Sequence, residues 1–174
     1  MKLITTIHQY DVSMFTWCMN RKHLNLFAEI SRRISQTGDG YLYALLGVYL
    51  LCSSLALDRM FLIVALLAFG IERPLYFVLK NGLRRNRPQE AIGIQSFIIP
   101  SDRFSFPSGH TSGAFLMATL ITYFHPALGI PVYIWSSLVG LSRIFLGVHF
   151  PTDILVGMLM GISMACLSLS LVLH

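Results

Sequence analysis

The chain has 174 residues, of which 55% are hydrophobic and only 12% are charged, and its formal net charge is +5. This composition excludes an ordinary soluble domain of this length and favours a single all-helical domain embedded in a membrane. The positive charge clusters beside polar segments and lacks interleaved aromatic residues. Phosphate and lipid head groups are therefore favoured as partners over nucleic acid.

The N-terminal segment, residues 1–37, alternates short apolar clusters with Arg21, Lys22, Arg32 and Arg33. Neither half contains enough uninterrupted apolar residues to cross a bilayer. We therefore expect two amphipathic helices that lie in the membrane interface, with their basic residues toward the head groups. A short soluble cap is the alternative for this segment.

Five apolar stretches follow and predict a bundle of about five transmembrane helices over residues 41–173. A Gly-Asp-Gly break precedes the first stretch, Asp58-Arg59 is expected to form a tight turn, and segment 84–106 is expected to be a polar loop. The expected spans are residues 41–57, 60–83, 107–124, 128–146 and 151–173.

Alternation of these spans brings the polar segments of the chain to one end of the bundle. Residues 1–40, 84–106 and 147–151 all fall on the same face under this topology. Three motifs lie in or beside these segments. The topology therefore predicts that the three motifs meet at one site.

Near Lys80 the second expected span ends in a basic run that also contains Arg87. Seven helical residues place these two cations on nearly the same face, roughly 10 Å apart along the axis. They bind one phosphate together only if the helix unwinds between them, which Gly82 permits. Basic residues that flank a span are also ordinary interfacial anchors. The same anchoring role is expected for Arg84, Arg85 and Arg103.

The third expected span opens with Ser108, Gly109 and His110. Ser108 is a natural N-cap, and Gly109 lets an anion approach the backbone closely. The free N–H groups and the positive dipole of a helix start form a seat for phosphate. His110 projects from the first turn, where it is placed to donate a proton. A capping serine beside glycine is common, so this motif alone does not establish a site.

Residues 142–153 carry an arginine, a histidine and an aspartate between apolar helical sequences. Pro151 favours a helix start at about residue 150, which places His149 just outside the helix and Asp153 in its first turn. A carboxylate beside an imidazole fixes its tautomer and raises its basicity, as a nucleophile or general base requires. Arg143 supplies a planar fork for phosphate. A polar re-entry loop at the membrane surface is the alternative.

Together the three motifs predict a phosphoryl transfer reaction. His149, oriented by Asp153, would attack phosphorus in line, and His110 would protonate the departing oxygen and then activate water to hydrolyse a phosphohistidine. The acidic residues are too scattered for a metal cage, so neither a metal nor another cofactor is expected. The groups expected around the phosphoryl group are Lys80, Arg87, Ser108, Gly109 and Arg143.

These motifs resemble the signature of the type 2 phosphatidic acid phosphatase family, within the superfamily shared with vanadium haloperoxidases. Lysine, six residues and Arg-Pro are matched by residues 80–88. Pro-Ser-Gly-His is matched by residues 107–110, and Ser-Arg, five residues, His, three residues and Asp by residues 142–153. The resemblance implies a metal-independent phosphatase that acts on membrane lipid phosphates or diphosphates with the residue roles given above.

Many members of this family have six spans, and the N-terminal one is not evident in this sequence. Short members with this plan resemble bacterial undecaprenyl diphosphate phosphatases, which recycle the cell-wall lipid carrier. The resemblance therefore implies undecaprenyl diphosphate as the first expected substrate, in the bacterial plasma membrane. Phosphatidylglycerophosphate, phosphatidate and lipid A phosphates remain open, and no feature sets an oligomeric state.

Three alternatives from other functional classes remain. A vanadate-dependent haloperoxidase would use the same pocket, but such relatives are generally soluble. A lipid phosphotransferase would pass the phosphoryl group to an acceptor other than water. A non-catalytic lipid-binding membrane protein or scaffold would need none of the intact residues His110, His149 and Asp153.

Glu72 and Arg73 lie within the second expected span, where charge is costly and usually faces the bundle interior. Because adjacent helical residues point in different directions, the two need not pair with each other. One hypothesis is that they line a polar cleft beneath the active site. A structural hydrogen-bonded pair between helices is the alternative.

The basic residues conflict with the family over membrane orientation. Eleven of the 13 Lys and Arg residues fall on the motif-bearing face, whereas Arg59 lies on the other face and Arg73 within a span. The positive-inside rule would place the motifs in the cytoplasm. The bacterial members that the chain resembles mostly face the periplasm or exterior. We expect that orientation, because several of these cations have a proposed substrate role.

Overall fold

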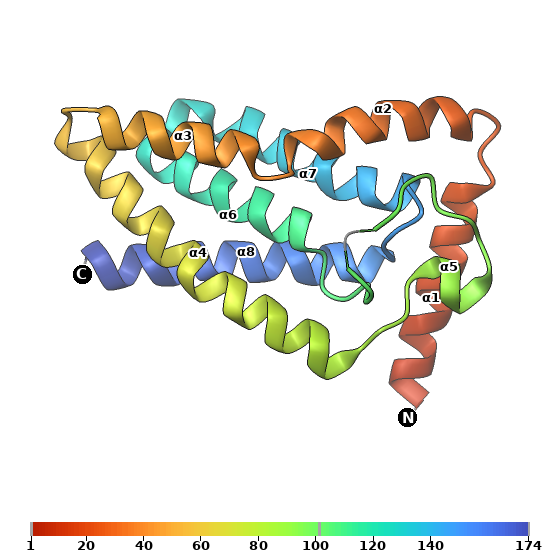
Figure 1. Ribbon diagram of the computed structural model, residues 1–174. Helices are drawn as coiled ribbons and strands as arrows, with labels where there is room; N and C mark the ends of the chain where they lie inside the picture. The colour runs from red at the N-terminus through yellow and green to blue at the C-terminus, as the bar shows by residue number, and fades with distance from the viewer. Residues whose placement is uncertain (1, 101, 174) are drawn as a thin grey trace.

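Regular structure in the described part of the chain is helical. The computed structural model describes residues 2–100 and 102–173, and these ranges contain no strand. The expected all-helical class is therefore confirmed, and Figure 1 shows the arrangement. The helices are α1 (Lys2–Met19), α2 (Leu24–Thr37), α3 (Tyr41–Cys52), α4 (Ala56–Leu83), α5 (Pro88–Ile92), α6 (Gly109–Phe124), η1 (Pro126–Leu128), α7 (Gly129–Phe145) and α8 (Pro151–Leu173).

Three helical stretches in the described ranges are long and apolar enough to cross a membrane. They are Ala56–Ile92, which contains α4, Pro126–Phe145, which contains α7, and Pro151–Leu173, which is α8. α3 has 12 residues and α6 has 16, so at about 1.5 Å per residue each is shorter than a hydrocarbon core of roughly 30 Å. The chain is thus a membrane-spanning protein, whereas the expected count of five spans stays a prediction.

The turn between α3 and α4 lies earlier than the sequence indicated. α3 ends at Cys52 and α4 begins at Ala56, so the turn expected at Asp58-Arg59 is wrong. Asp58 instead lies in the first turn of α4, where a carboxylate interacts favourably with the positive end of the helix dipole. Its Oδ2 also accepts a hydrogen bond of 2.5 Å from Ser53 Oγ, across the turn.

Segment 84–106 contains a short helix within the expected loop. α5 begins at Pro88, whose fixed φ suits the first helical position. Arg84 adopts a left-handed conformation with φ of 47° and ends α4, so the chain leaves the helix between Lys80 and Arg87. The unwinding that joint phosphate binding requires is present, and it occurs just after Gly82.

α6 and α8 approach each other at two glycines of α8. A Cβ atom on Gly157 would lie 2.6 Å from Ser108 O, and one on Gly161 would lie 2.2 Å from Ser112 O. Small residues of this kind let two helices pack backbone against backbone. The contact sets the start of α6 against the first turn of α8, where Ser108 N donates to Asp153 O at 3.0 Å.

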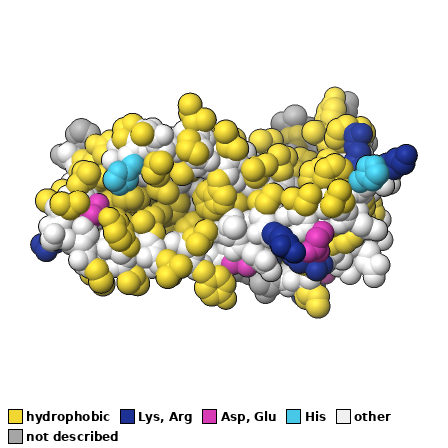
Figure 2. Space-filling model, turned by 90° about the horizontal axis from the view of Figure 1, so that it is seen from above, with side chains coloured by type: hydrophobic (Ala, Val, Ile, Leu, Met, Phe, Trp, Pro, Cys, Tyr) yellow, Lys and Arg dark blue, Asp and Glu magenta, His cyan; other side chains and the backbone are white. Residues whose placement is uncertain are grey.

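The two ends of the bundle differ in composition. One end holds an apolar core cluster that includes Leu50, Phe61, Leu120 and Phe124. α1 crosses the opposite end, next to α5, as Figure 1 shows. Figure 2 shows apolar side chains over most of the face seen from above, with most charged side chains gathered toward one end. The interfacial position expected for α1 and α2 stays a prediction.

Candidate active site

Three segments separated in sequence meet at the end of the bundle that α1 crosses. They are the α4–α5 connection, the start of α6 and the loop between α7 and α8. Hydrogen bonds join them, because Arg87 Nη1 donates to Val148 O at 2.7 Å and Ser108 N donates to Asp153 O at 3.0 Å. The structure brings these expected site residues to this end: Lys80, Arg87, Ser108, Gly109, His110, Arg143, His149 and Asp153.

His149 lies in the loop before α8 and is buried, with 2% of its surface exposed. Its Nδ1 lies 3.7 Å from Asp153 Oδ2 and has no hydrogen-bond partner. Burial lowers the pKa of His149 well below its ordinary value, and the positive charges of Arg143, Arg87 and Lys80 lower it further. The imidazole is therefore neutral near pH 7, which is the state that a nucleophile requires.

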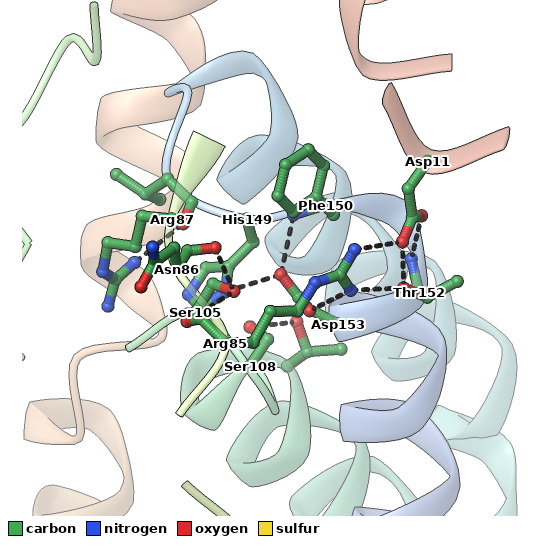
Figure 3. A network of polar contacts seen from close by, with 12 residues as sticks. Asp11, Arg85, Asn86, Arg87, Ser105, Ser108, His149, Phe150, Thr152 and Asp153 are labelled. Carbon is green, nitrogen blue, oxygen red and sulfur yellow. Dashed lines mark hydrogen bonds and ion pairs between the residues drawn. The ribbon is translucent and has the colours of Figure 1, made fainter. Parts of the chain in front are cut away.

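Asp153 is fully buried in the first turn of α8, beside the His149 ring. Its Oδ2 accepts a hydrogen bond of 2.8 Å from Phe150 N, in the manner of a capping box, and its Oδ1 accepts one of 2.8 Å from Arg85 Nη1. Figure 3 shows both contacts. The backbone and Arg85 thus hold the carboxylate near His149, at a distance too long for a direct hydrogen bond to the ring.

Lys80 and Arg87 share one anion in this structure, the carboxylate of Asp102. Asp102 Oδ2 lies 2.9 Å from Lys80 Nζ and accepts a hydrogen bond of 2.6 Å from the Tyr76 hydroxyl, whereas Oδ1 pairs with Arg87 Nη2. Partial burial raises the pKa of Asp102, but hydrogen bonds from Tyr76 and Lys80 and the two positive charges outweigh it and bring the pKa to about 2. The two cations therefore form a site that holds an oxyanion.

Arg143 lies in the last turn of α7 and lines a cleft. Its Nη1 donates to Ser35 Oγ of α2 at 2.5 Å, which fixes the guanidinium against the N-terminal half of the chain. Its Nε is buried without a hydrogen-bond partner. A buried donor of this kind is costly unless a ligand completes it, and an oxyanion is the ligand that suits a guanidinium.

The start of α6 has the expected N-cap residue in an unexpected arrangement. Ser108 precedes α6 but makes no capping bond with its side chain, and its hydroxyl lies 2.9 Å from Thr111 Oγ1 instead. A Cβ atom on Gly109 would lie 2.9 Å from the Tyr76 ring, so the close approach of the tyrosine requires glycine there. The backbone N–H groups at this helix start remain suited to an anion.

His110 has a carboxylate partner that no local pattern indicated. Its Nε2 lies 2.7 Å from Oδ1 of Asp39, which stands in the link before α3. Gly40 follows with φ of 99°, a conformation that favours glycine, and it lets the chain turn directly into the helix. The contact fixes the orientation of the ring that is expected to move the proton.

A cleft of about 870 Å³ opens at this end of the bundle, and Gly109, His110 and Arg143 line it, whereas Lys80, Arg87, Ser108, His149 and Asp153 lie behind its wall. One part of its wall is polar and includes Asp102, His110 and Arg143. Another part of the wall is apolar and aromatic. A charged wall beside an apolar one fits an amphiphile with an anionic head group. The apolar and aromatic wall includes Tyr43, Phe69, Phe77, Ile98 and Ile99.

Glu72 and Arg73 of α4 pair with each other, although their adjacency in the helix did not require it. Arg73 donates through Nε and, at 2.7 Å, through Nη2 to the Glu72 carboxylate, because its long side chain curls back. Glu72 is fully buried and also accepts a hydrogen bond from Ser112 of α6. Arg73 lines the cleft. The pair thus joins two helices and contributes to the cleft wall.

Sequence reasoning missed the carboxylates that pair with the basic motifs. Asp39 and Asp102 carry no spacing signal relative to the residues they contact. Arg85, expected to be an interfacial anchor, instead contacts Asp153 at 2.8 Å. Its position five residues after Lys80, inside the first motif, was the available clue.

The acidic side chains near the site pair with cations and do not gather together. Asp102 pairs with Lys80 and Arg87, and Asp153 pairs with Arg85. Within residues 2–100 and 102–173, no three His, Cys, Asp or Glu side chains form a group that could hold a metal ion. Metal-independent chemistry stays a prediction for experiment.

The lysine, two arginines and two histidines gathered at this end of the bundle lie in a part of the chain that matches a known protein family. The pattern of the PAP2 superfamily matches residues 41–173. The chain belongs to the PAP2 superfamily. The resemblance indicated by the three motifs is therefore confirmed, whereas α1 and α2 lie outside the matched range.

Curated relatives include two proteins of Bacillus subtilis (strain 168). Phosphatidylglycerophosphatase B is 38% identical over 114 residues, which cover 58% of this chain and 52% of that protein. Undecaprenyl-diphosphatase BcrC is 34% identical over 76 residues, which cover 44% of this chain and 39% of that protein. The matches thus span about half or less of the length of these relatives.

Two solved PAP2-like structures share the fold over most of the chain. Aquifex aeolicus LpxE superposes with a TM-score of 0.77 at 28% identity and covers 91% of this chain and 93% of its own. A transmembrane PAP2 type phosphatidylglycerolphosphate phosphatase from Bacillus subtilis superposes with a TM-score of 0.73 at 26% identity and covers 95% of this chain and 86% of its own. Both likenesses extend beyond the range that the superfamily pattern matches.

Proposed function

We propose that the protein is a membrane lipid phosphatase that hydrolyses a lipid phosphate or diphosphate through a phosphohistidine at His149. The main support is the carboxylate of Asp102, which Lys80 and Arg87 hold in the neighbourhood of a buried neutral imidazole. An anion site near a nucleophile is the arrangement that phosphoryl transfer requires. Membership of the PAP2 superfamily supports the same class of reaction.

In the proposed complex, the phosphoryl group of the substrate replaces the Asp102 carboxylate. Lys80 and Arg87 then contact phosphoryl oxygens, and the unpartnered Nε of Arg143 supplies a further donor. The Ser108 hydroxyl and the Gly109 amide complete the site from the start of α6. Cations on several sides neutralise the charge of the transition state, which is the main task in this chemistry.

The reaction has two displacement steps. First, His149 attacks phosphorus, the bond from phosphorus to the oxygen of the leaving lipid alcohol or lipid phosphate breaks, and His110 donates a proton to that oxygen. Second, His110 takes a proton from water, the water oxygen attacks phosphorus, and the bond from phosphorus to His149 breaks to release inorganic phosphate. Asp153, held beside the ring, stabilises the positive charge that the phosphorylated imidazole carries.

The cleft supports a lipid substrate with an anionic head, because its apolar and aromatic wall adjoins the basic groups. Undecaprenyl diphosphate and phosphatidylglycerophosphate are the first candidates, since relatives named for each substrate match this chain. Phosphatidate follows. The site would lie at the periplasmic or exterior face of a bacterial plasma membrane.

Membrane orientation is tested by labelling a single cysteine. A Glu90→Cys variant, in a background without Cys18, Cys52 and Cys166, is treated in intact cells with an impermeant thiol reagent. Labelling before lysis supports the exterior orientation. Labelling only after lysis contradicts it and agrees with the distribution of basic residues.

The function is tested by phosphate release from purified protein in detergent with a chelator present. The panel contains undecaprenyl diphosphate, phosphatidylglycerophosphate, phosphatidate and a soluble phosphomonoester. His149→Ala is compared with His125→Ala, a matched change at the far end of α6. We expect chelator-resistant release that only His149→Ala abolishes. Absence of release by folded protein would overturn the proposal, and transfer of phosphate to a lipid acceptor would identify a phosphotransferase.

A further inference from the structure

The N-terminal helix reaches the active site through a buried acid, Asp11. Asp11 lies in α1 and has 2% of its surface exposed. Its Oδ1 accepts a hydrogen bond of 2.9 Å from the backbone N–H of Thr152, and its Oδ2 accepts one from the Thr152 hydroxyl. Thr152 lies in the first turn of α8, where a backbone N–H has no hydrogen-bond partner within the helix. Asp11, from another helix, supplies the acceptor for this N–H and places a negative charge at the positive end of the helix dipole.

Arg85 links Asp11 to the carboxylate beside His149. Its Nη2 donates to Asp11 Oδ2 at 2.5 Å, and its Nη1 donates to Asp153 Oδ1 at 2.8 Å. Figure 3 shows the guanidinium between the two carboxylates. The Arg85 Cζ also lies 4.5 Å from the centre of the Phe150 ring, so it packs on the residue that follows His149. One cation thus holds two acids and the end of the α7–α8 loop.

Apolar contacts hold α1 against the same loop. The rings of Phe15 and Phe150 pack edge to face with centroids 5.5 Å apart, and both residues are fully buried. The His8 ring also packs edge to face on Phe150, with centroids 6.0 Å apart. Since Asp11 lies between these two positions of α1, its carboxylate is held in a fixed place relative to Asp153.

The charge balance of this network affects the field at His149. A guanidinium shared between two carboxylates leaves one net negative charge, whereas a guanidinium paired with Asp153 alone leaves none. Negative charge beside an imidazole favours its cationic forms, which include the phosphorylated ring. The negative charge of Asp11 therefore compensates the positive charge of Arg85, so that the negative charge of Asp153 still acts on the His149 ring.

We propose that Asp11 and Arg85 are positioning residues of the active site, and that α1 is a functional part of it. Asp11 acts through Arg85 on Asp153, and neither residue is assigned a contact with the reacting phosphoryl group. The inference rests on the proposed function, because it takes the roles of His149 and Asp153 from there. Residues 41–173 match the PAP2 superfamily, so the family pattern assigns nothing to Asp11.

Other charged groups also affect the pKa of His149, so the first variant changes only Asp11 and leaves those groups in place. Asp11→Asn keeps the size of the side chain and removes its charge. The double variant Asp11→Asn/Arg85→Gln removes one charge of each sign and leaves Asp153 without a competing cation. The unchanged groups around His149 are Lys80 of α4, Arg87 before α5, His110 of α6, Arg143 of α7 and Asp153 of α8.

The test is a pH titration of His149, monitored by ¹⁵N NMR of histidine-labelled protein in detergent. The His149 signals are assigned by their loss in His149→Gln. Asp58→Asn is the matched control, because Asp58 is a buried acid, 3% exposed, at the far end of the bundle. We expect Asp11→Asn to lower the pH midpoint of the His149 titration by about 0.5 to 1 unit, and the double variant to return it toward that of the wild type. The control should leave the midpoint unchanged.

Phosphate release supplies a second readout on the same preparations. We expect kcat of Asp11→Asn on phosphatidylglycerophosphate to fall about tenfold with KM within about twofold, and the double variant to recover part of the loss. An unchanged midpoint with only a loss of folded protein would overturn the proposal, as would a double variant with the midpoint of the single one.

The two proposals fail in different ways. If the wild type releases no phosphate from any lipid while the midpoints move as expected, the phosphatase function fails and the positioning role stands. If the wild type releases phosphate while the midpoints do not move, the phosphatase function stands and α1 is only a structural brace. If Asp11→Asn does not fold, Asp11→Glu decides, since it keeps the charge and should keep the midpoint of the wild type, and a lowered midpoint in that variant would overturn the proposal.

Discussion

The two ends of the helix bundle treat buried charge in opposite ways. At the α3–α4 end, Asp58 is a buried acid that Ser53 hydrogen-bonds at 2.5 Å, near an apolar core. At the α1 end, buried or half-buried charged groups contact one another: Asp11, Lys80, Arg85, Arg87, Asp102 and Asp153. Ion pairs of this kind contribute little net stability, because desolvation offsets their attraction.

The difference indicates that one end of the bundle stabilises the fold and the other end carries the proposed chemistry. The apolar end and the α6–α8 contact stabilise the bundle, whereas the charged end keeps donors and acceptors in place for a ligand. Among the described residues at that end, Nδ1 of His149 and Nε of Arg143 are buried without a hydrogen-bond partner. Groups left incomplete in a folded protein point to function, since packing alone does not require them.

The largest expected effect is a loss of activity without a loss of stability, in His149→Ala. Because His149 is the proposed nucleophile, its removal should lower kcat/KM by at least about a thousandfold. The melting temperature should change much less than the activity, because Nδ1 of His149 makes no hydrogen bond that the variant would lose. Parallel assays of phosphate release and thermal unfolding check this. A melting temperature that falls together with activity would contradict the separation of the two ends.

The opposite effect, a loss of stability, is expected at the contact between α6 and α8. In Gly161→Ala the new Cβ would lie 2.2 Å from Ser112 O, and backbone cannot move aside cheaply. We expect a loss of about 1 to 3 kcal/mol in the free energy of unfolding in detergent. Gly70→Ala is the control, because a Cβ atom there meets nothing within 4 Å. Equal stability of the two variants would refute the close contact.

Removal of the Asp102 carboxylate, which competes with phosphate for Lys80 and Arg87, should raise the affinity of the charged end for phosphate. Asp102→Asn leaves Lys80 and Arg87 without their carboxylate, so the inhibition constant for inorganic phosphate should fall about threefold to tenfold. Competition assays measure it, with Glu90→Gln as the control for an exposed acid in the same segment. An unchanged constant would show that phosphate does not replace Asp102.

The pH dependence of activity should report the buried state of His149. Because the pKa of His149 lies well below its ordinary 6.5, the ring stays neutral as the pH falls through that value. We expect kcat/KM, corrected for ionisation of the substrate, not to decline as the pH falls from about 7.5 to about 6. A decline centred near 6.5 would indicate an exposed histidine and would weaken the contrast between the ends.

The smallest expected effect lies at the apolar end. Asp58→Asn removes a charge but keeps an acceptor for Ser53, so unfolding should become easier by about 1 kcal/mol. Activity should not change, because Asp58 lies at the opposite end from His149. Unfolding and phosphate release from one preparation give both numbers. A loss of activity at full folding would show that the two ends are coupled.

Much of the fold was predictable from local patterns. Pro151 suits a helix start, and α8 begins there and runs to the expected Leu173. Lys80, Arg87 and Arg143 were identified by their chemistry and spacing, and alternation of the spans brought them to one end. The turn before α4 was misplaced, because Asp58-Arg59 is as typical of a helix start as of a turn.

The contacts that complete the site were not predictable in the same way. Asp11 meets Thr152 across 141 residues, and Asp39 meets His110 across 71. Helical periodicity describes neighbours three or four residues apart, so it carries no information about such pairs. Asp102 lies in an irregular segment, where no period applies. Tertiary packing alone determines which acid meets which cation.

The central claim is that His149 carries the phosphoryl group during turnover. The most direct measurement is a rapid quench of the purified protein with ³²P-labelled phosphatidylglycerophosphate and undecaprenyl diphosphate, followed by mapping of the labelled peptide by mass spectrometry. We predict a label that is stable in alkali, labile in acid and located on His149, and that His149→Ala does not acquire. Phosphate release without any label on this histidine, or with a label on another residue, would contradict the account.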